Sequence, residues 1–233
     1  DDAVTNANDL VIETIIDDKN PAVLMQALSS LAVRNNLPPL RDRVSADKRP
    51  ALDAAIKASG LPVQAYDRLE TWAAAFLLLG AQFRSIGLES AEGVEMVLRK
   101  DFQSKGKTIG ALESNVEQLG YFDRLPEEAQ LALLEGALSD NKDMNQEFGA
   151  MLEAWASGDV ERIALTFDRD LAEVPALRDA LMVQRNRNWT GWIERRMNQP
   201  GVTLVAVGAG HLAGKDSVLA MLSQQGYRVR RVQ

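Results

Sequence analysis

The sequence predicts an α/β fold in which a small central β-sheet is surrounded by many helices. Short segments rich in β-branched residues lie far apart along the chain, and longer segments with helical signals separate them. Of the 233 residues, 46% are apolar and 25% are charged, which is typical of a globular protein. We expect one domain over residues 1–233, with residues 114–198 forming an inserted or capping helical subdomain.

Four segments are predicted to be strands because they are short, apolar and bounded by turn residues: 9–16, 106–112, 202–207 and 227–232. Glu13 is expected in the middle of the first strand, and Glu113 directly follows the second. The third strand is the clearest and continues into Gly208 and Gly210.

Helices are expected between these strands, from apolar periodicity and from proline and glycine at segment ends: 22–33, 45–60, 69–86, 92–104, 116–119, 126–139, 144–157, 160–167, 176–197 and 218–225. Pro62 is expected to begin a further short helical turn. The helix over 69–86 is predicted to be core, since Trp72 and Phe76 recur at helical spacing.

Composition excludes several classes of function. Lys and Arg number 26 against 33 Asp and Glu, and a net charge of −7 disfavours a general nucleic-acid binder. The chain has no cysteine, so disulfides, thiolate zinc sites and cysteine nucleophiles are absent. His211 is the only histidine, so a Ser-His-Asp hydrolase would have to use it, and one chain cannot form a multi-histidine metal site.

The strongest local signal is Gly208-Ala209-Gly210-His211 at the end of a predicted strand. We expect the glycines to allow a tight turn with positive φ, and the imidazole to lie at the carboxyl edge of the sheet, where ligands bind in open α/β folds. The alternative is an ordinary strand-to-loop turn. A third glycine and an immediate helix are missing, which argues against a dinucleotide site.

Two acidic residues and one arginine are further candidates. Glu13 lies among apolar neighbours, so it either faces a site or is buried with a partner. Glu113 either projects toward the same edge or begins a helix. Arg185 shares a helix face with Trp189, so it either packs on the indole ring or points at a carboxylate of the substrate or of the site.

Several segments in this order resemble the TraB/GumN family, whose animal relatives are the Tiki proteases: Leu10–Glu13, Gly93–Glu95, Gly106–Glu113, Arg185–Asn186, and Val205–His211 with Gly226–Val229. The resemblance covers almost the whole chain and implies a small sheet with many helices, as in erythromycin esterase and ChaN-like folds. It implies a metal-dependent hydrolase of peptidase or esterase type that acts on a peptide or small molecule.

The resemblance also implies site residues. His211 and Glu13 would bind a divalent Mn, Co or Zn ion, and Glu113 and Arg185 would act in catalysis. Gly208, Gly210 and Asn186 would contact the ligand. A periplasmic or envelope location is a family inference, and peripheral membrane association is a further expectation.

The sequence departs from the family pattern, which has two Gly-x-x-His motifs and an intervening glutamate. Here Gly208–His211 matches the second motif and Glu13 the glutamate, but no first motif is present. We therefore expect that a strand before Asp9 is missing, that this chain is inactive or nearly so and need not hold a metal, and that an exposed sheet edge favours a homodimer. The alternative is a non-catalytic binding or accessory module that keeps the fold, with the basic helix 176–197 as its binding surface.

Overall fold

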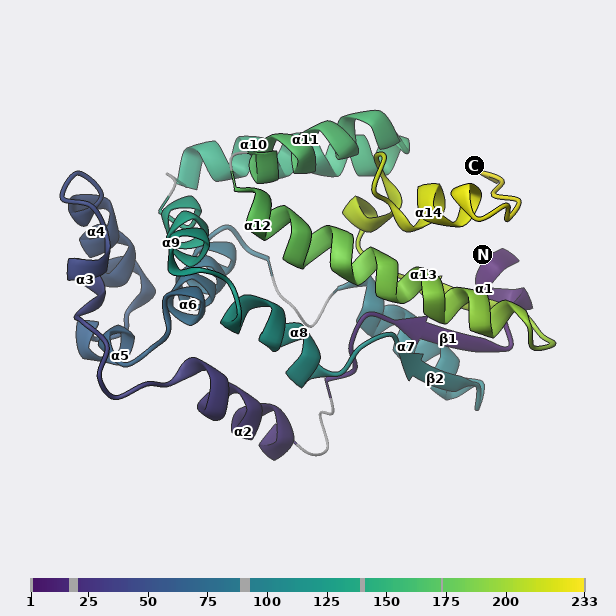
Figure 1. Cartoon of the computed structure of the whole chain (residues 1–233), viewed down its shortest axis with the longest axis horizontal. Coiled ribbons are helices and arrows are strands. Elements are labelled where there is room, and N and C mark those ends of the chain that lie inside the picture. Colours follow the sequence, from purple (N-terminus) through teal and green to yellow (C-terminus); the bar gives the residue numbers. More distant parts are fainter. Residues whose placement is uncertain (1, 17–20, 89–92, 139–140, 173, 233) are drawn as a thin grey trace. The chain divides into compact units, whose positions relative to one another are not determined.

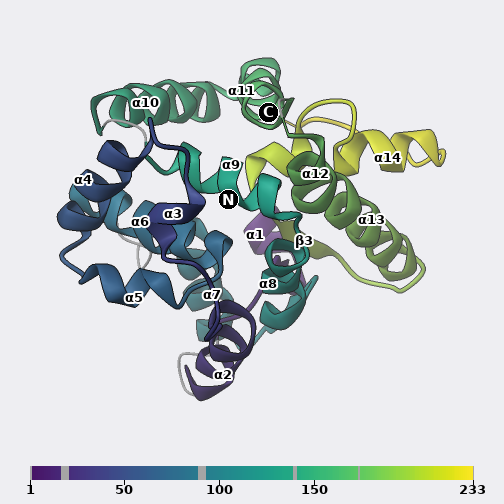
Figure 2. The ribbon, with the colours of Figure 1, turned by 60° about the vertical axis from the view of Figure 1, so that its left-hand side comes forward.

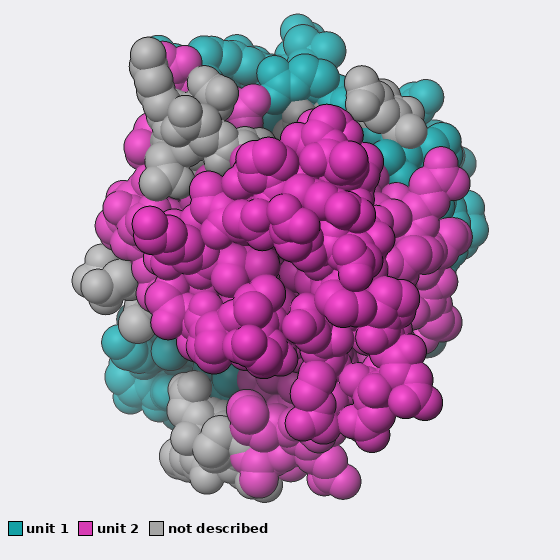
Figure 3. Space-filling model, turned by 90° about the vertical axis from the view of Figure 1, so that its left-hand side faces the viewer, with its two compact units in different colours: residues 1–16, 90–115, 150–233 teal, residues 17–89, 116–149 magenta. Residues whose placement is uncertain are grey.

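The computed structural model describes residues 2–16, 21–88, 93–138, 141–172 and 174–232. They form two compact units that alternate along the sequence (Figure 3). Unit 1 contains residues 1–16, 90–115 and 150–233, and unit 2 contains residues 17–89 and 116–149. The single domain expected from the sequence, with its subdomain at 114–198, stays a prediction.

Unit 1 is built on a parallel sheet of three short strands, β1 (Asp9–Ile12), β2 (Thr108–Ala111) and β3 (Thr203–Ala206), in the order β2-β1-β3. Figure 1 shows β1 beside β2, and β3 is labelled in Figure 2. The central strand is the most apolar, and three of its four residues are buried. The small parallel sheet among many helices confirms the α/β fold class. In the described sheet β2 and β3 are edge strands, and dimerisation through such an edge stays a prediction.

The predicted strand at 227–232 is wrong. These residues follow α14 (Val218–Gln224) as an irregular segment that pairs with no strand in the described structure. Its apolar side chains are exposed, up to 81% at Val232. Alternation of apolar and charged residues favours a strand, but pairing also needs a sheet edge within reach, which periodicity cannot show.

Helices cover the sheet of unit 1 with apolar side chains. Leu10 and Ile12 of β1 pack with Phe102 of α7 (Val94–Ser104). Trp189 of α13 (Gln184–Met197) packs with Leu222 of α14. The predicted helix 176–197 is one continuous rod made of α12 (Pro175–Arg178), the π-helical turn η2 (Asp179–Val183) and α13 (Figure 2). The other helical segments are α1 (Asp2–Asn6), α11 (Val160–Ala172) and the 3₁₀ turn η3 (Ala209–Leu212); α10 (Asn141–Ser157) crosses the unit boundary in sequence.

The regular secondary structure of unit 2 is helical apart from one isolated bridge, as far as the unit is described. Its helices are α2 (Pro21–Ala32), α3 (Leu40–Arg43), α4 (Arg49–Ser59), α5 (Val63–Asp67), α6 (Thr71–Ser85), α8 (Asn115–Asp123), which begins one residue before the boundary, and α9 (Glu127–Gly136). The predicted core helix is confirmed in α6, where Trp72 is fully buried, although Phe83 is 40% exposed. α4 begins at Arg49, later than the predicted residue 45, with Pro50 in its first turn.

None of the helices in the described part of the chain combines the length and the hydrophobicity that a membrane span requires.

Candidate functional site

The ends of the three parallel strands bring the predicted site residues together. Glu13 directly follows β1 and does not lie in the middle of a strand as predicted. The two segments stay hydrogen-bonded just past the strands, because the amide of Glu113 donates a hydrogen bond to the carbonyl oxygen of Glu13 over 3.0 Å. Gly208 follows β3 by two residues. Since carboxyl ends of parallel strands share one edge, segments far apart in sequence meet here.

Arg185 of α13 lies at the centre of this cluster and is 6% exposed. Its Nε donates to both carboxylate oxygens of Glu113, at 3.0 and 3.3 Å, and Nη2 donates to Glu113 Oε1 and to Glu13 Oε2, the latter at 2.7 Å. Nη1 lies 3.3 Å from His211 Nε2 and 3.4 Å from the carbonyl oxygen of Leu181. These contacts engage all five N–H groups of the guanidinium.

The carboxylates keep Arg185 charged. Burial lowers the pKa of Arg185, but hydrogen bonds and electrostatic attraction from Glu113 and Glu13 raise it more, so that the net pKa is above its ordinary value. The guanidinium is therefore a permanent cation inside unit 1.

His211 is held as a neutral imidazole of one tautomer. Asn186 donates from Nδ2 to the carbonyl oxygen of Asp216 over 2.7 Å, so its Oδ1 is an acceptor. His211 Nδ1 lies 2.6 Å from that Oδ1 and must carry the proton, which leaves Nε2 to accept from Arg185. Burial lowers the pKa of His211 to about 4; the charge of Glu13 raises it and that of Arg185 lowers it further.

Trp189 completes the buried side of the cluster. Its indole Nε1 donates to Glu113 Oε2 over 3.3 Å, and its ring lies 4.6 Å from the guanidinium carbon of Arg185 and 4.4 Å from the ring of His211. Both sequence interpretations of Arg185 therefore hold together, because it packs over the indole and also pairs with site carboxylates.

Glu13 is the most exposed ionic group of the cluster. Its Oε1 accepts a hydrogen bond from the amide of Gly208 over 2.7 Å, while Oε2 accepts from Arg185. The side chain of Glu13 is 22% exposed, against 5% for Glu113 and 8% for Arg185. Any molecule that reaches this edge from solvent therefore has more access to Glu13 than to these two partners.

The expected reason for the two glycines is wrong. Gly208 has φ −54° and Gly210 is not among the glycines with positive φ. Space for a side chain is instead tight at Gly208, and at Gly210 it is missing unless Phe167 moves. A Cβ at Gly208 would lie 3.3 Å from Glu13 Oε1, and one at Gly210 would lie 2.7–2.9 Å from three ring carbons of Phe167.

Three contributors to the site were not anticipated: Phe167, Asp216 and Leu181. Asp216 accepts from Asn186 through its carbonyl, and its carboxylate pairs with Arg178 over 2.6 Å. Asp216 precedes the helix cap Ser217, which predicts a turn but not a contact with α12. No pattern in the sequence marks Phe167 or the carbonyl of Leu181.

The residues present do not fit the metal centre that the family resemblance implies. In the parts of the chain that the structure describes, no three His, Asp or Glu side chains are placed to hold a metal ion. The free lone pair of His211 faces Arg185, and so does one oxygen of Glu13.

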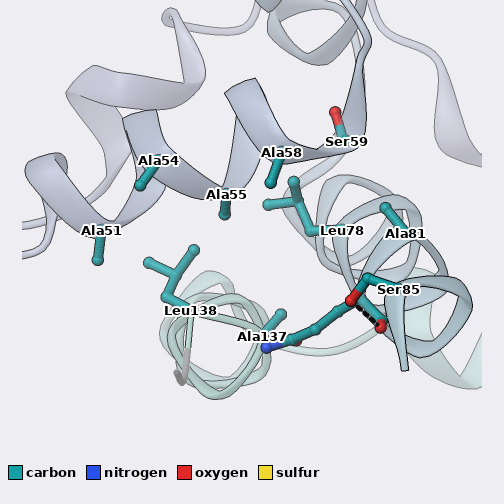
Figure 4. A pocket seen from close by; sticks show the side chains of 11 residues that line it. Ala51, Ala54, Ala55, Ala58, Ser59, Leu78, Ala81, Ser85, Ala137 and Leu138 are labelled. Atoms are coloured by element: carbon teal, nitrogen blue, oxygen red, sulfur yellow. Dashed lines mark hydrogen bonds between the residues drawn. The ribbon is translucent and has the colours of Figure 1, made fainter. Parts of the chain in front are cut away.

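A cavity of about 290 Å³ lies within unit 2 and is lined by none of the predicted site residues. Its walls are mostly alanine and leucine side chains of α4 and α6, with Ala137 and Leu138 after α9 (Figure 4). Its few polar groups include Ser85, whose hydroxyl donates to the carbonyl of Gln82 over 2.7 Å. No charged side chain lines it, so it offers no acid–base chemistry.

Comparisons with known proteins agree with the motifs. The chain is 27% identical over 183 residues to the uncharacterized protein YbaP of Escherichia coli (strain K12). The matched residues make up 78% of this chain and 67% of YbaP. The match to YbaP of Shigella flexneri has the same identity and coverage. No solved structure matches significantly. The TraB/PrgY/gumN family pattern matches residues 1–231, and the chain therefore belongs to the TraB/PrgY/gumN family.

Proposed function

We propose that unit 1 carries the active site of a hydrolase that cleaves an amide or ester bond in a peptide or small molecule. The observation that supports this most is the meeting of Glu13, Glu113, Arg185 and His211 at the carboxyl edge of a parallel sheet. Ionisable groups buried together at this edge are typical of active sites in α/β proteins.

Glu13 is the residue that we assign to the reaction itself. Its carboxylate accepts a proton from a water molecule as the water oxygen attacks the substrate carbonyl, and later returns the proton to the departing amine or alcohol. The amide of Gly208 and the guanidinium of Arg185 hold one oxygen each, so that the carboxylate has a fixed orientation.

The other members of the cluster are assigned as positioning residues. Arg185 fixes Glu13 and does not bind a substrate carboxylate, because its N–H groups are already engaged. Glu113 and His211 hold Arg185 in turn, and Asn186 sets the tautomer of His211. Residues in the core of unit 1 therefore fix the position of Glu13 at the carboxyl edge of the sheet.

The second candidate is a non-catalytic binding module that keeps the family fold. One observation favours it: the hydrogen bonds of Arg185 are satisfied within the chain, which is the expected state of a structural network. In this case Glu13 would bind a ligand without a reaction.

A substrate screen separates the two candidates. Wild-type protein is tested on panels of fluorogenic peptides and chromogenic esters, with and without added divalent metal, beside Glu13→Gln. The control is Glu161→Gln, which removes an exposed carboxylate of α11 in the same unit. We expect turnover to fall at least 100-fold in Glu13→Gln and to be unchanged in Glu161→Gln. Equal turnover in Glu13→Gln and wild type would contradict the proposal.

A further inference from the structure

We propose that Arg185 takes the place of a divalent metal ion in this cluster, so that the site is permanently closed to metal. The proposal concerns binding and does not rest on the hydrolase proposal. A catalytically inert protein would give the same result.

The first step is that the guanidinium already holds the atoms that a metal would need. A metal at this edge would take one oxygen each from Glu13 and Glu113 and the free nitrogen of His211. Each of these atoms faces a nitrogen of Arg185: Glu13 Oε2 at 2.7 Å, Glu113 Oε1 at 3.0 Å from Nε, and His211 Nε2 at 3.3 Å. The other nitrogen of His211 is protonated and bound to Asn186, so it offers no second route to a metal.

The second step concerns charge. Two carboxylates would attract a cation to this buried site, and Arg185 supplies one covalently. A metal could enter only by displacing the guanidinium, and that would leave a buried cation without its hydrogen-bond acceptors. Arg185 therefore balances the charge of the carboxylates and also excludes a metal ion from the site.

The third step is that Arg185 has little freedom to swing away. It is the second residue of α13, close after the π-helical turn η2, and its Nη1 also donates to the carbonyl of Leu181 within η2. Trp189, one helical turn later, packs against the guanidinium. Contacts on two sides of the side chain thus hold it between the three acceptor groups.

Metal titration of the full chain tests the proposal. Zn²⁺, Mn²⁺ and Co²⁺ are added separately to wild type, Glu13→Gln and His211→Ala, and binding is measured by calorimetry and by the shift in Tm. We expect the three proteins to bind each metal alike, since any binding occurs at other surface groups. A metal affinity that falls 10-fold or more in both Glu13→Gln and His211→Ala would overturn the proposal.

A second variant tests the competition directly. Arg185→Gln removes the cation, and Arg195→Gln removes an exposed arginine of the same helix as a control. We expect Zn²⁺ at a hundredfold excess over its Kd to raise the Tm of Arg185→Gln by about 5 °C and to leave Arg195→Gln at the wild-type response. If Arg185→Gln folds and its Tm does not rise with Zn²⁺, the proposal that Arg185 occupies the place of a metal ion is refuted. If this variant does not fold, the wild-type comparison above decides alone.

Discussion

Replacing Arg185 by methionine removes the cation that ties Glu13, Glu113 and His211 together while keeping a long side chain over Trp189. The side chains of Arg185 and Glu113 are only 8% and 5% exposed, so water cannot take over the lost hydrogen bonds. Removing one partner of a buried ion pair costs about 3–5 kcal/mol. We therefore expect the free energy of unfolding to fall by about that amount in Arg185→Met.

The assay is urea denaturation followed by circular dichroism, with tryptophan fluorescence as a second probe. The matched control is Arg162→Met, because Arg162 pairs with Glu153 over 3.2 Å but the two side chains are 46% and 71% exposed. The control should cost at most about 1 kcal/mol. A loss below about 1 kcal/mol in Arg185→Met itself would refute the argument that this cluster is desolvated.

A double variant separates the loss of the pair from the burial of a lone charge. Arg185→Met combined with Glu113→Gln removes the cation and the carboxylate that it contacts most. Trp189 can still donate to the amide oxygen of the new side chain. In the double variant no deeply buried carboxylate remains at position 113 without its cation, and the Glu13 carboxylate that remains is 22% exposed. We therefore expect the double variant to lose at least about 1 kcal/mol less than the sum of the losses of the two single variants.

Three further predictions follow from the same unit. Burial lowers the pKa of His211 to about 4, below its ordinary value of 6.5, so between these pH values His211 is protonated in the unfolded chain but not in the folded one. The free energy of unfolding should therefore decrease as pH falls from about 6.5 to 4, by up to about 3 kcal/mol. Urea titrations at pH 7.5 and 4.5 should show that His211→Gln lacks this part of the pH dependence. Gly210→Ala places a Cβ 2.7–2.9 Å from the ring of Phe167, so it should lower the free energy of unfolding by about 1–3 kcal/mol, and Phe167→Leu in the same chain should recover part of that loss if the clash is its cause. Ser217→Ala removes the side chain that accepts a hydrogen bond from the amide of Ala220 at the start of α14, and thermal unfolding should show a loss of about 1 kcal/mol; an unchanged Tm would mean that the cap contributes nothing.

Local pattern predicted the three segments that contain the strands, whether the strand is buried, as β1 is, or only partly buried, as β2 and β3 are. The segment 9–16 contains β1, whose residues Leu10, Val11 and Ile12 are buried. The segments 106–112 and 202–207 contain β2 and β3. The same reasoning failed at 227–232, because alternation describes a face that could be buried, and only the fold decides whether a neighbouring strand exists to bury it.

Most of the site residues could be predicted from the sequence because parallel strands end at a common edge of the sheet. Glu113 and the loop Gly208–His211 follow predicted strands, so their meeting could be expected once those strands were assigned. Glu13 was expected in the middle of its strand, and the structure places it directly after β1. Arg185 could be placed on a helix, but its choice of partner could not. From the sequence, Arg185 could contact either Trp189, four residues later, or a distant carboxylate. In the tertiary structure it contacts both.

By itself, the sequence determined the fold class, the three strands, the single imidazole and the absence of thiol chemistry. These features follow from residue types and from the spacing of apolar residues, which are local properties of the chain. The tertiary structure alone decided that Phe167 leaves no room for a side chain at Gly210, and that the carbonyl of Asp216 sets the tautomer of His211 through Asn186. It also placed the arginine where the lone pairs of two carboxylates and an imidazole converge, since such contacts depend on distances between residues that are far apart in sequence.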